Sequence, residues 1–161
     1  MTKQQEQKCR DAKQRLLLST RFREPFEFED ELGSLTYYTL YFLMKIMPLS
    51  KLFGYYGICD QLVRSVTSIG ANVAEGRGRA TFPSVINFLG IARGSLFESI
   101  KHIEYLYVFC PDDHKEELFN LHDAWKNKFI PSFEKQYNVL LEEYIQEFSV
   151  DTQEFVIEVP Q

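Results

Sequence analysis

The sequence has little of several features that would fix a fold or a function class at once. Only three cysteines occur, Cys9, Cys59 and Cys110, and their odd number and wide spacing favour reduced thiols over a disulfide framework or a zinc site. The longest apolar run, residues 35–49, is interrupted by a lysine and a proline and is too short to cross a bilayer. No apolar signal segment is found near the N-terminus, so we expect a cytoplasmic protein with no membrane partner.

Charged residues are unevenly distributed along the chain. Acidic side chains are scarce in two segments and basic ones in a third, so the net charge of −5 hides local differences. Residues 1–23 carry seven basic side chains against two acidic ones, whereas residues 104–161 carry four against thirteen. Between them, residues 64–101 carry five basic and two acidic side chains. The acidic total argues against coating of nucleic acid by the whole surface, but it leaves room for local basic patches.

Hydrophobic residues make up 45% of the chain and aromatic residues 15%, which is enough to build a core. They recur at intervals of three and four residues in four segments, the pattern of amphipathic helices. The predicted helices span about residues 30–47, 58–78, 83–109 and 116–144.

Local signals define the ends of these helices. Pro48 and Pro111 are expected to end the first and the third, because the residue before proline avoids the helical region. Gly76 or Gly78 is expected to end the second in the left-handed conformation. The start of the fourth helix is assigned to a capping pair, Asp113 with Glu116.

Four helices joined by short connections predict an all-α fold, an antiparallel up-down four-helix bundle. Pro131 falls inside the fourth helical stripe, where the missing N–H predicts a kink. The expected organisation is a mobile basic arm over residues 1–26, the bundle over residues 27–148 and a C-terminal tail over residues 149–161.

Sequence motifs for catalysis are missing. Helical bundles often hold metal centres through Glu-x-x-His pairs, but the nearest case, Glu98 with His102, is spaced by four and has no second copy. No serine nucleophile elbow, phosphate-binding loop or dinucleotide fingerprint is present. The sequence therefore predicts a protein that is not an enzyme and holds no metal and no cofactor.

The informative stretch runs from Gln61 to Leu106, and it contains QLVR, SIGANVAEGRGR and ARGSLFE. With these motifs the chain resembles the four-helix-bundle proteins encoded by intervening sequences in bacterial large-subunit ribosomal RNA genes. That family includes the accessory variability determinant of diversity-generating retroelements. The resemblance implies a bundle that assembles into a homopentamer. In the retroelement branch it implies binding of RNA or DNA, and of the reverse transcriptase, through basic surface.

The motif residues admit two interpretations. In the first they lock the corner between the second and third helices. Asn72 and Glu75 share a helix face, and Arg93 and Ser95 on the next helix supply donors to them. Glu75 paired with Arg93 or with Arg79 would then hold the corner in one arrangement.

The second interpretation is a basic strip that contacts phosphate groups, with two arginines projecting from a turn loosened by Gly76 and Gly78. The predicted nucleic-acid-binding residues are Arg64, Arg77, Arg79, Arg93 and Lys101.

Two further features indicate close contacts. Gly90 and Gly94 lie four residues apart inside the third helix and let another helix approach, either within the bundle or across a subunit boundary. Five tyrosines add aromatic surface beyond the core stripes, typical either of an interface or of half-buried helix packing. They are Tyr37, Tyr38, Tyr41, Tyr55 and Tyr56.

Together these features predict a non-enzymatic, self-assembling accessory protein that binds nucleic acid and a nucleic-acid enzyme such as a reverse transcriptase. The alternative is a protein–protein adaptor or scaffold without nucleic-acid binding, whose acidic C-terminal half attracts a basic partner.

Overall fold

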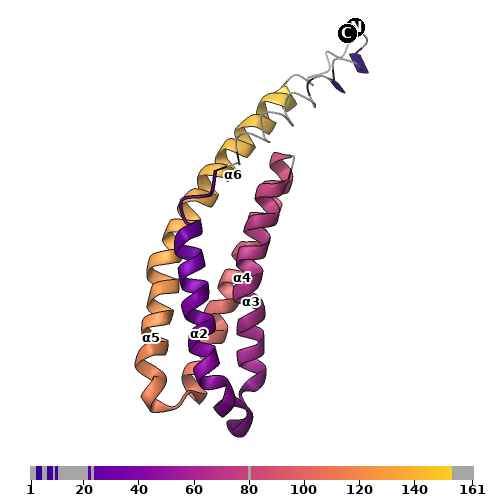
Figure 1. The fold of residues 1–161 in the computed structure, drawn as a ribbon. Coiled ribbons are helices and arrows are strands. Elements are labelled where there is room, and N and C mark those ends of the chain that lie inside the picture. Colours follow the sequence, from indigo (N-terminus) through magenta and orange to yellow (C-terminus); the bar gives the residue numbers. More distant parts are fainter. Residues whose placement is uncertain are drawn as a thin grey trace, which may run out of the picture.

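The computed structural model describes residues 3–4, 7–8, 10, 22, 24–79 and 81–153. Within these ranges all regular secondary structure is helical, so the predicted all-α class is confirmed. With the labels of Figure 1, the elements are α2 (Glu29–Phe53), α3 (Tyr56–Gly78), α4 (Phe82–Phe109), the 3-10 turn η1 (Asp112–His114), α5 (Lys115–Asp123), the π-helical turn η2 (Ala124–Phe129) and α6 (Ile130–Gln153).

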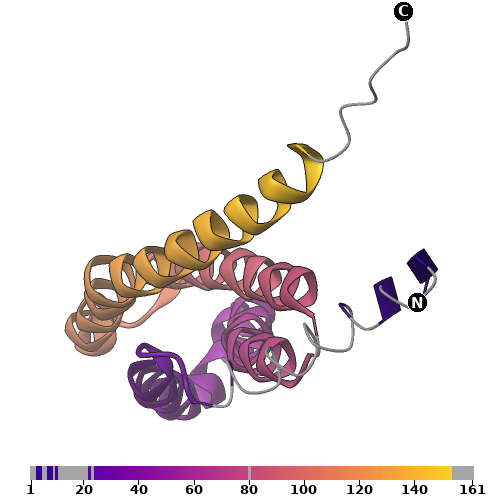
Figure 2. The same cartoon turned by 90° about the horizontal axis from the view of Figure 1, so that it is seen from above.

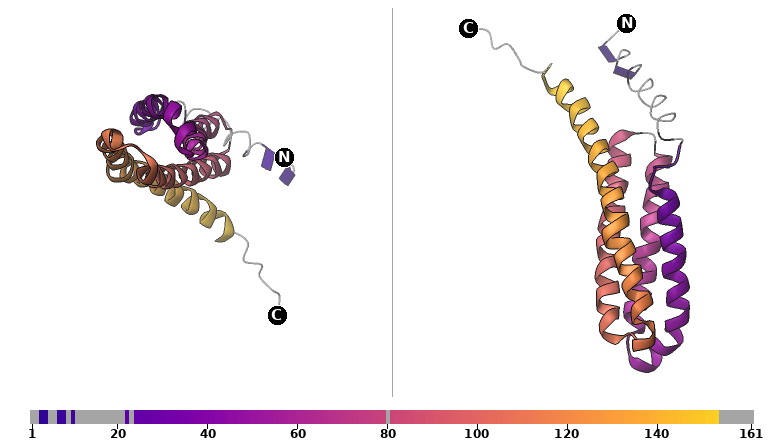
Figure 3. Two further views of the ribbon diagram at one scale, coloured as in Figure 1. Left: turned by 90° about the horizontal axis from the view of Figure 1, so that it is seen from below. Right: turned by 90° about the vertical axis from the view of Figure 1, so that its left-hand side faces the viewer.

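The last three elements follow one another without a break and form the fourth long helical segment. Figure 1 shows α2 joined to α3 at the lower end of the molecule and α3 joined to α4 at the upper end. Helix α3 packs against both α2 and α4, and α4 packs in turn against α5 and α6. The views from above and from the side show α6 extending past the end of α4 (Figures 2 and 3).

Helix α2 does not end at Pro48, so that prediction is wrong. The proline lies inside the helix, which continues to Phe53 and ends at Gly54, whose φ of 79° is left-handed. A proline in a helix leaves the carbonyl four residues earlier without its donor. Here that carbonyl belongs to Met44, a residue that is 73% exposed, on the solvent side of the helix. The cost of the proline is therefore small enough for the helix to continue.

The end of α3 also differs from the prediction. Among the described residues the only positive φ is that of Gly54, so the left-handed geometry expected at Gly76 or Gly78 is wrong. Helix α3 ends at Gly78 and is followed by Arg79 in an extended conformation. Gly76 is instead required by a close contact with α4, described below.

Helix α4 has the predicted ends. It begins after Thr81 with Pro83 in its first turn, where a missing N–H costs nothing. It ends at Phe109, and Cys110 is extended because it precedes Pro111.

The capping pair predicted for the fourth segment is not formed. Asp113 lies in η1, and the residue that precedes α5 is His114, which makes no side-chain capping bond. The turn is closed instead by an ion pair of 2.7 Å between Lys115 and Asp112. The 3-10 turn shifts the helix start by one residue, which separates Asp113 from the free N–H groups.

The π-helical turn η2 leads directly into Pro131. A π-helical turn bonds residues five apart instead of four and is wider than an α-helical turn. The proline therefore follows a widened turn. The residues four and five positions before it, Asn127 and Lys126, are exposed. The helix continues past this point to Gln153. The kink at Pro131 stays a prediction.

Large aromatic side chains fill the core between α2 and the fourth segment. The ring centroids of Phe28 and Phe133 are 4.9 Å apart, and those of Trp125 and Phe129 are 5.2 Å apart. The buried Trp125 Nε1–H donates to Thr39 Oγ1 at 2.9 Å. This bond explains why threonine lies in an otherwise apolar stripe of α2.

Two phenylalanines of the predicted arm are part of this core. Phe22 and Phe26 are buried, and the Phe22 ring lies 5.7 Å from that of Phe82. At the other end, α6 extends to Gln153, into the predicted tail. The boundaries of arm, bundle and tail stay predictions, since most of residues 1–23 and all of 154–161 lie outside the described residues.

Cys59 and Cys110 are free thiols buried in the core, as predicted for small hydrophobic residues. Burial raises the pKa of the Cys59 thiol to about 11, so it stays protonated at neutral pH. Cys9 lies outside the described residues. None of the helices in the described ranges is long and apolar enough to cross a membrane.

Candidate functional site

A row of small polar side chains links α3 to α4, and we call it the serine ladder. Ser65 on α3 accepts a hydrogen bond of 2.9 Å from Ser99 on α4. One turn further along, Ser68 and Ser95 share a hydrogen bond of 2.9 Å. The Asn72 amide donates to the Ser68 carbonyl at 2.8 Å and extends the row toward the corner.

These contacts bring the two helices close together. Small side chains leave little space between the helices, and their hydroxyl groups bond to each other, so the buried polar atoms are satisfied. At the corner Gly76 is buried, and a Cβ added there would lie 3.2 Å from Phe88 Cβ and 3.5 Å from the Val85 carbonyl. This part of the motif therefore sets helix distance and register.

The predicted partners of Glu75 are only partly right. Glu75 pairs with Arg79 on its own helix, which was one of the two options, and both side chains are about half exposed. Arg93 binds Glu134 on α6 instead, with Nε and Oε1 2.6 Å apart. Because the Glu75 pair lies at the C-terminal end of α3 and does not cross to α4, the corner is held by the serine ladder and Gly76.

Arg77 makes a tie that the sequence did not reveal. Its Nη1 donates to Glu29 Oε2 at 2.8 Å, and both side chains are largely buried. The other oxygen of Glu29 accepts the Phe26 backbone N–H at 2.8 Å. One carboxylate thus caps the start of α2 and fixes the end of α3 to it. The two residues are 48 positions apart, so local spacing carries no signal of the pair.

All five cations of the predicted strip have a carboxylate partner within the chain. Besides the three arginines described above, Arg64 binds Asp60 at 3.0 Å and Lys101 binds Glu104 at 2.6 Å. The Glu104 hydrogen bond raises the pKa of Lys101, which stays charged. The side chains of Arg64 and Lys101 are 72% and 63% exposed, so these two are the most accessible of the five.

Two of these arginines also lie over aromatic rings. The Arg79 guanidinium is 4.6 Å from the Phe88 ring centroid, and that of Arg93 is 5.0 Å from Phe97. A guanidinium over a ring face is held by the ring quadrupole as well as by its carboxylate. These arginines are therefore fixed in position.

The two glycines of α4 have different surroundings. A Cβ at Gly90 would lie 3.5 Å from the Tyr137 hydroxyl on α6, a contact within the bundle. A Cβ at Gly94 would meet none of the described atoms within 4 Å.

Four of the five predicted surface tyrosines are exposed: Tyr37, Tyr38, Tyr41 and Tyr56. The prediction is wrong for Tyr55, which is only 1% exposed. The left-handed turn at Gly54 reverses the chain directly before it, and the Tyr55 ring lies against Phe109 with centroids 6.4 Å apart.

Possible metal ligands do not gather in the described part of the chain, where no group of three or more His, Cys, Asp and Glu side chains is arranged to hold an ion. Glu98 and His102 form a single contact of 3.4 Å.

The polar motif thus sits in a helical bundle in which each cation of the strip has a carboxylate partner and in which Gly76 and Gly90 lie at contacts between helices. The sequence profile of a family described as 23S rRNA-intervening sequence protein matches residues 39–127, more than half of the chain. The chain belongs to this family. Comparison with curated proteins and with solved structures finds no match.

The match to the 23S rRNA-intervening sequence protein family confirms the resemblance drawn from the motifs. It covers all of α3, α4 and α5, with parts of α2 and η2. The serine ladder, the close-packed Gly76 and the exposed tyrosine Tyr41 all lie inside it. Helix α6 and the aromatic residues before Thr39 lie outside it.

Proposed function

We propose that this chain is a non-enzymatic accessory protein of the cytoplasm that assembles with copies of itself, into a homopentamer by family resemblance. The supporting observation is the amount of exposed apolar surface. Folded monomers rarely expose apolar patches larger than a few hundred Å². Large exposed hydrophobic side chains gather mainly on α2 and α4: Tyr37, Tyr38, Tyr41, Met44, Leu52, Phe53, Ile91, Phe97, Tyr105, Tyr107, Val108 and Phe109.

The subunit of this assembly is an antiparallel up-down bundle with a kink at Pro131. Connections of a few residues, at alternating ends of the molecule, support the antiparallel order. The kink is supported by the neighbourhood of a proline and a π-helical turn, two features at which helices bend.

The absence of catalysis is part of the same proposal. The polar residues of the α3–α4 corner are consumed by contacts with one another, and they do not converge on a cavity. Among the described residues, the polar groups of this corner serve the register of α3 and α4, which supports a structural role for them.

The test of self-assembly is light scattering after gel filtration over a range of concentrations. We expect a mass several times the 19.0 kDa of one chain, stable on dilution. A mass of 19 kDa at every concentration would overturn the proposal.

Nucleic-acid binding is a second candidate function, through Arg64, Arg77, Arg79, Arg93 and Lys101. The specific observation in its favour is the pairing of arginines with aromatic rings, since single-stranded nucleic acids are held by stacking platforms and cations together. The carboxylate partners compete with phosphate, so we expect weak binding that falls with salt.

The experiment is a titration of labelled single-stranded RNA and DNA at several salt concentrations. Removing the two most exposed cations, Arg64→Ala with Lys101→Ala, should weaken binding and lower the salt dependence by about one unit per contact. Lys135→Ala, an exposed lysine outside the strip, is the control. Absence of binding at low salt would reject this candidate.

A protein–protein adaptor without nucleic-acid binding is the alternative. Its supporting feature is the acidic surplus after residue 104, which would attract a basic partner such as a reverse transcriptase. A pull-down with a purified reverse transcriptase, in the presence and absence of nuclease, distinguishes the adaptor from the nucleic-acid-binding protein. Capture that survives nuclease favours the adaptor.

A further inference from the structure

Helix α2 carries a row of exposed side chains that we call the tyrosine ridge: Tyr37, Tyr38, Tyr41 and Met44. The three tyrosines are 65%, 61% and 49% exposed. Residues 37, 41 and 44 follow helical spacing on one face. The Tyr37 and Tyr41 rings are nearly parallel, at 8°, with centroids 6.3 Å apart. They form a flat, projecting apolar surface.

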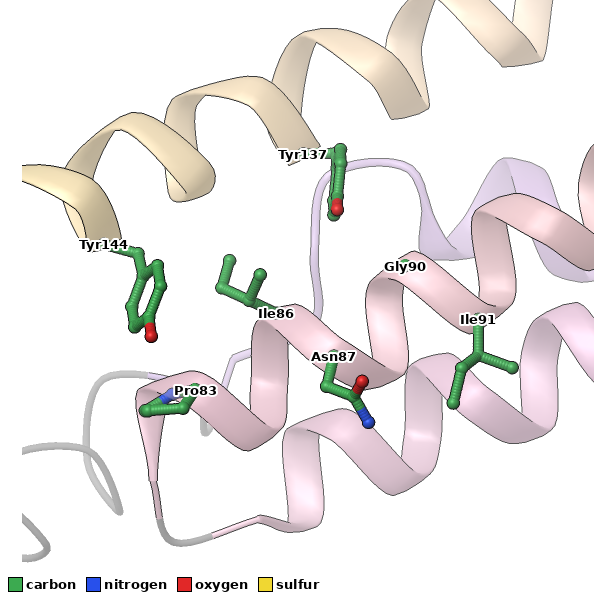
Figure 4. Close-up of a pocket in the computed structure, with 7 residues that line it drawn as sticks. All are labelled: Pro83, Ile86, Asn87, Gly90, Ile91, Tyr137 and Tyr144. Atoms are coloured by element: carbon green, nitrogen blue, oxygen red, sulfur yellow. The ribbon is translucent and has the colours of Figure 1, made fainter.

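The same chain contains a complementary hollow. Figure 4 shows a groove between α4 and α6, of about 430 Å³. Its floor and one side are formed by α4 around Ile86, Asn87, Gly90 and Ile91, and its other side by tyrosines of α6. The groove is mainly apolar, and the Asn87 amide offers a polar group at its edge. A volume of this size is typical of sites that take ring systems.

We propose that the tyrosine ridge of one copy docks into the α4–α6 groove of the next copy. This inference rests on the proposed self-assembly and names the two surfaces that carry it. The tyrosine rings fill the apolar hollow, and their hydroxyl groups bond to the Asn87 amide and to the Tyr137 hydroxyl. Such amphipathic rings with a polar end are the residues that interfaces favour.

The ridge supplies more than half of the area that one side of a stable interface needs. Its four side chains are 49–73% exposed and offer on the order of 500 Å². Each partner of a standard interface buries about 800 Å². The exposed Leu52, Phe53 and Tyr56 lie beyond the ridge, at the end of α2 and the start of α3.

The charge of the ridge supports contact with an apolar groove. No acidic residue occurs between Leu32 and Cys59. Lys45 and Lys51 each lie near a tyrosine ring, Tyr41 and Tyr56, and Lys45 is also neutralised by Glu117 of α5 at 2.7 Å. No carboxylate of this stretch would have to be desolvated when the ridge is covered.

The ridge and the groove lie on different helices. Helix α2 packs against α3 and α5, whereas the groove lies between α4 and α6. Each copy therefore offers one ridge and one groove, and neither surface pairs with itself. A ridge–groove contact that is not reciprocal across a two-fold axis is heterologous, and heterologous contacts close into rings when the rotation between copies permits it.

Two variants test the inference, each built on exposed residues so that the fold is kept. Tyr37→Ser with Tyr41→Ser removes the ridge, and Asn87→Arg with Ile91→Arg blocks the groove with charge. We expect each variant alone to fall to the mass of one chain in light scattering. Phe119→Ser, at an exposed ring of α5 outside both surfaces, is the control and should assemble like the unmodified protein.

Mixing the two variants gives the decisive result. The ridge variant keeps its groove and the groove variant keeps its ridge, so one working contact remains. We expect a species of two chains and none larger. Circular dichroism and the fluorescence of the buried Trp125 check that both variants are folded.

The experiment distinguishes a failure of the proposed self-assembly from a failure of the ridge–groove contact. If the unmodified protein is a monomer, both the proposed function and this inference are wrong. If it assembles but either variant still assembles, or if the mixture forms no pair, self-assembly stands and the ridge–groove contact is wrong.

Discussion

The two sides of the bundle are built by different physical means. Between α3 and α4 the contact consists of serines, an asparagine and a glycine, which bond to each other and allow a close approach. Between α2 and the fourth segment it consists of large rings such as Phe28, Trp125 and Phe133. The first contact fixes the register through specific hydrogen bonds, and the second buries large aromatic rings.

This difference teaches which substitutions each side tolerates. A ring removed from the aromatic side leaves a cavity, whereas an atom added to the α3–α4 side has no space. The two sides should therefore respond in opposite ways to a change of side-chain volume.

The largest effect is expected on the aromatic side, at Trp125. Trp125→Ala removes a fully buried ring and its bond to Thr39, and it should lower the free energy of unfolding by about 3–5 kcal/mol. Denaturant unfolding followed by circular dichroism measures this loss. Phe119→Ala, at an exposed ring of α5, should change stability by less than about 1 kcal/mol. Equal effects at both positions would contradict the assignment of the core.

An intermediate effect is expected from adding volume at the α3–α4 corner. Gly76→Val places methyl groups where even a Cβ lies 3.2 Å from Phe88, so stability should fall by about 1–3 kcal/mol. The matched change Gly94→Ala meets open space and should raise stability by up to about 1 kcal/mol, because alanine favours the helix. Thermal unfolding of both variants checks the opposite signs, and a stabilised Gly76 variant would refute close packing.

The smallest effect is expected from a single hydroxyl of the serine ladder. Ser99→Ala removes a buried bond to Ser65 and should cost about 0.5–1.5 kcal/mol. A double-mutant cycle with Ser65→Ala measures the coupling between the two side chains. Additive losses would show that the hydrogen bond does not carry the register.

Much of the fold follows from local pattern. The apolar stripes locate the four helical segments, and they include Leu62, Leu96 and Trp125, which are all fully buried. Periodicity succeeds here because each helix has one face toward the core. The end of α4 could also be predicted from local sequence, because Pro111 restricts the backbone of the residue directly before it.

The wrong predictions concern features that depend on exposure to solvent or on contacts between distant parts of the chain. Pro48 was expected to end α2, but the carbonyl it leaves without a donor belongs to Met44, an exposed residue on the solvent side of the helix. Tyr55 was expected at the surface, but the turn at Gly54 reverses the chain and buries it. Sequence spacing does not show in advance which carbonyl will face water or where a turn will direct a ring.

The sequence predicted which residues belong to the candidate site, but it did not predict which of them form ion pairs. The motif located the α3–α4 corner, and Glu75 with Arg79 was one of two options offered by spacing. The partners of Arg77 and Arg93 come from α2 and α6, 48 and 41 positions away along the chain. Only the packed bundle brings them within reach. Thr39 in an apolar stripe gives no signal of its partner Trp125, because its hydroxyl is also satisfied locally, donating to the Leu35 carbonyl at 2.7 Å.

The π-helical turn η2 sets the direction in which the side chains of α6 point around the helix axis. Leu121, Trp125, Phe129, Phe133 and Tyr137 are each four residues apart, and in an α-helix every such step drifts about 40° around the axis. A wider turn at residues 124–129 takes up this drift and keeps the rings on one side. Deletion of one residue there would rotate α6 by about 100° and carry Tyr137 out of the groove. One extra residue in one turn thus sets the angle at which α6 lies against α4 and places Tyr137 at the groove.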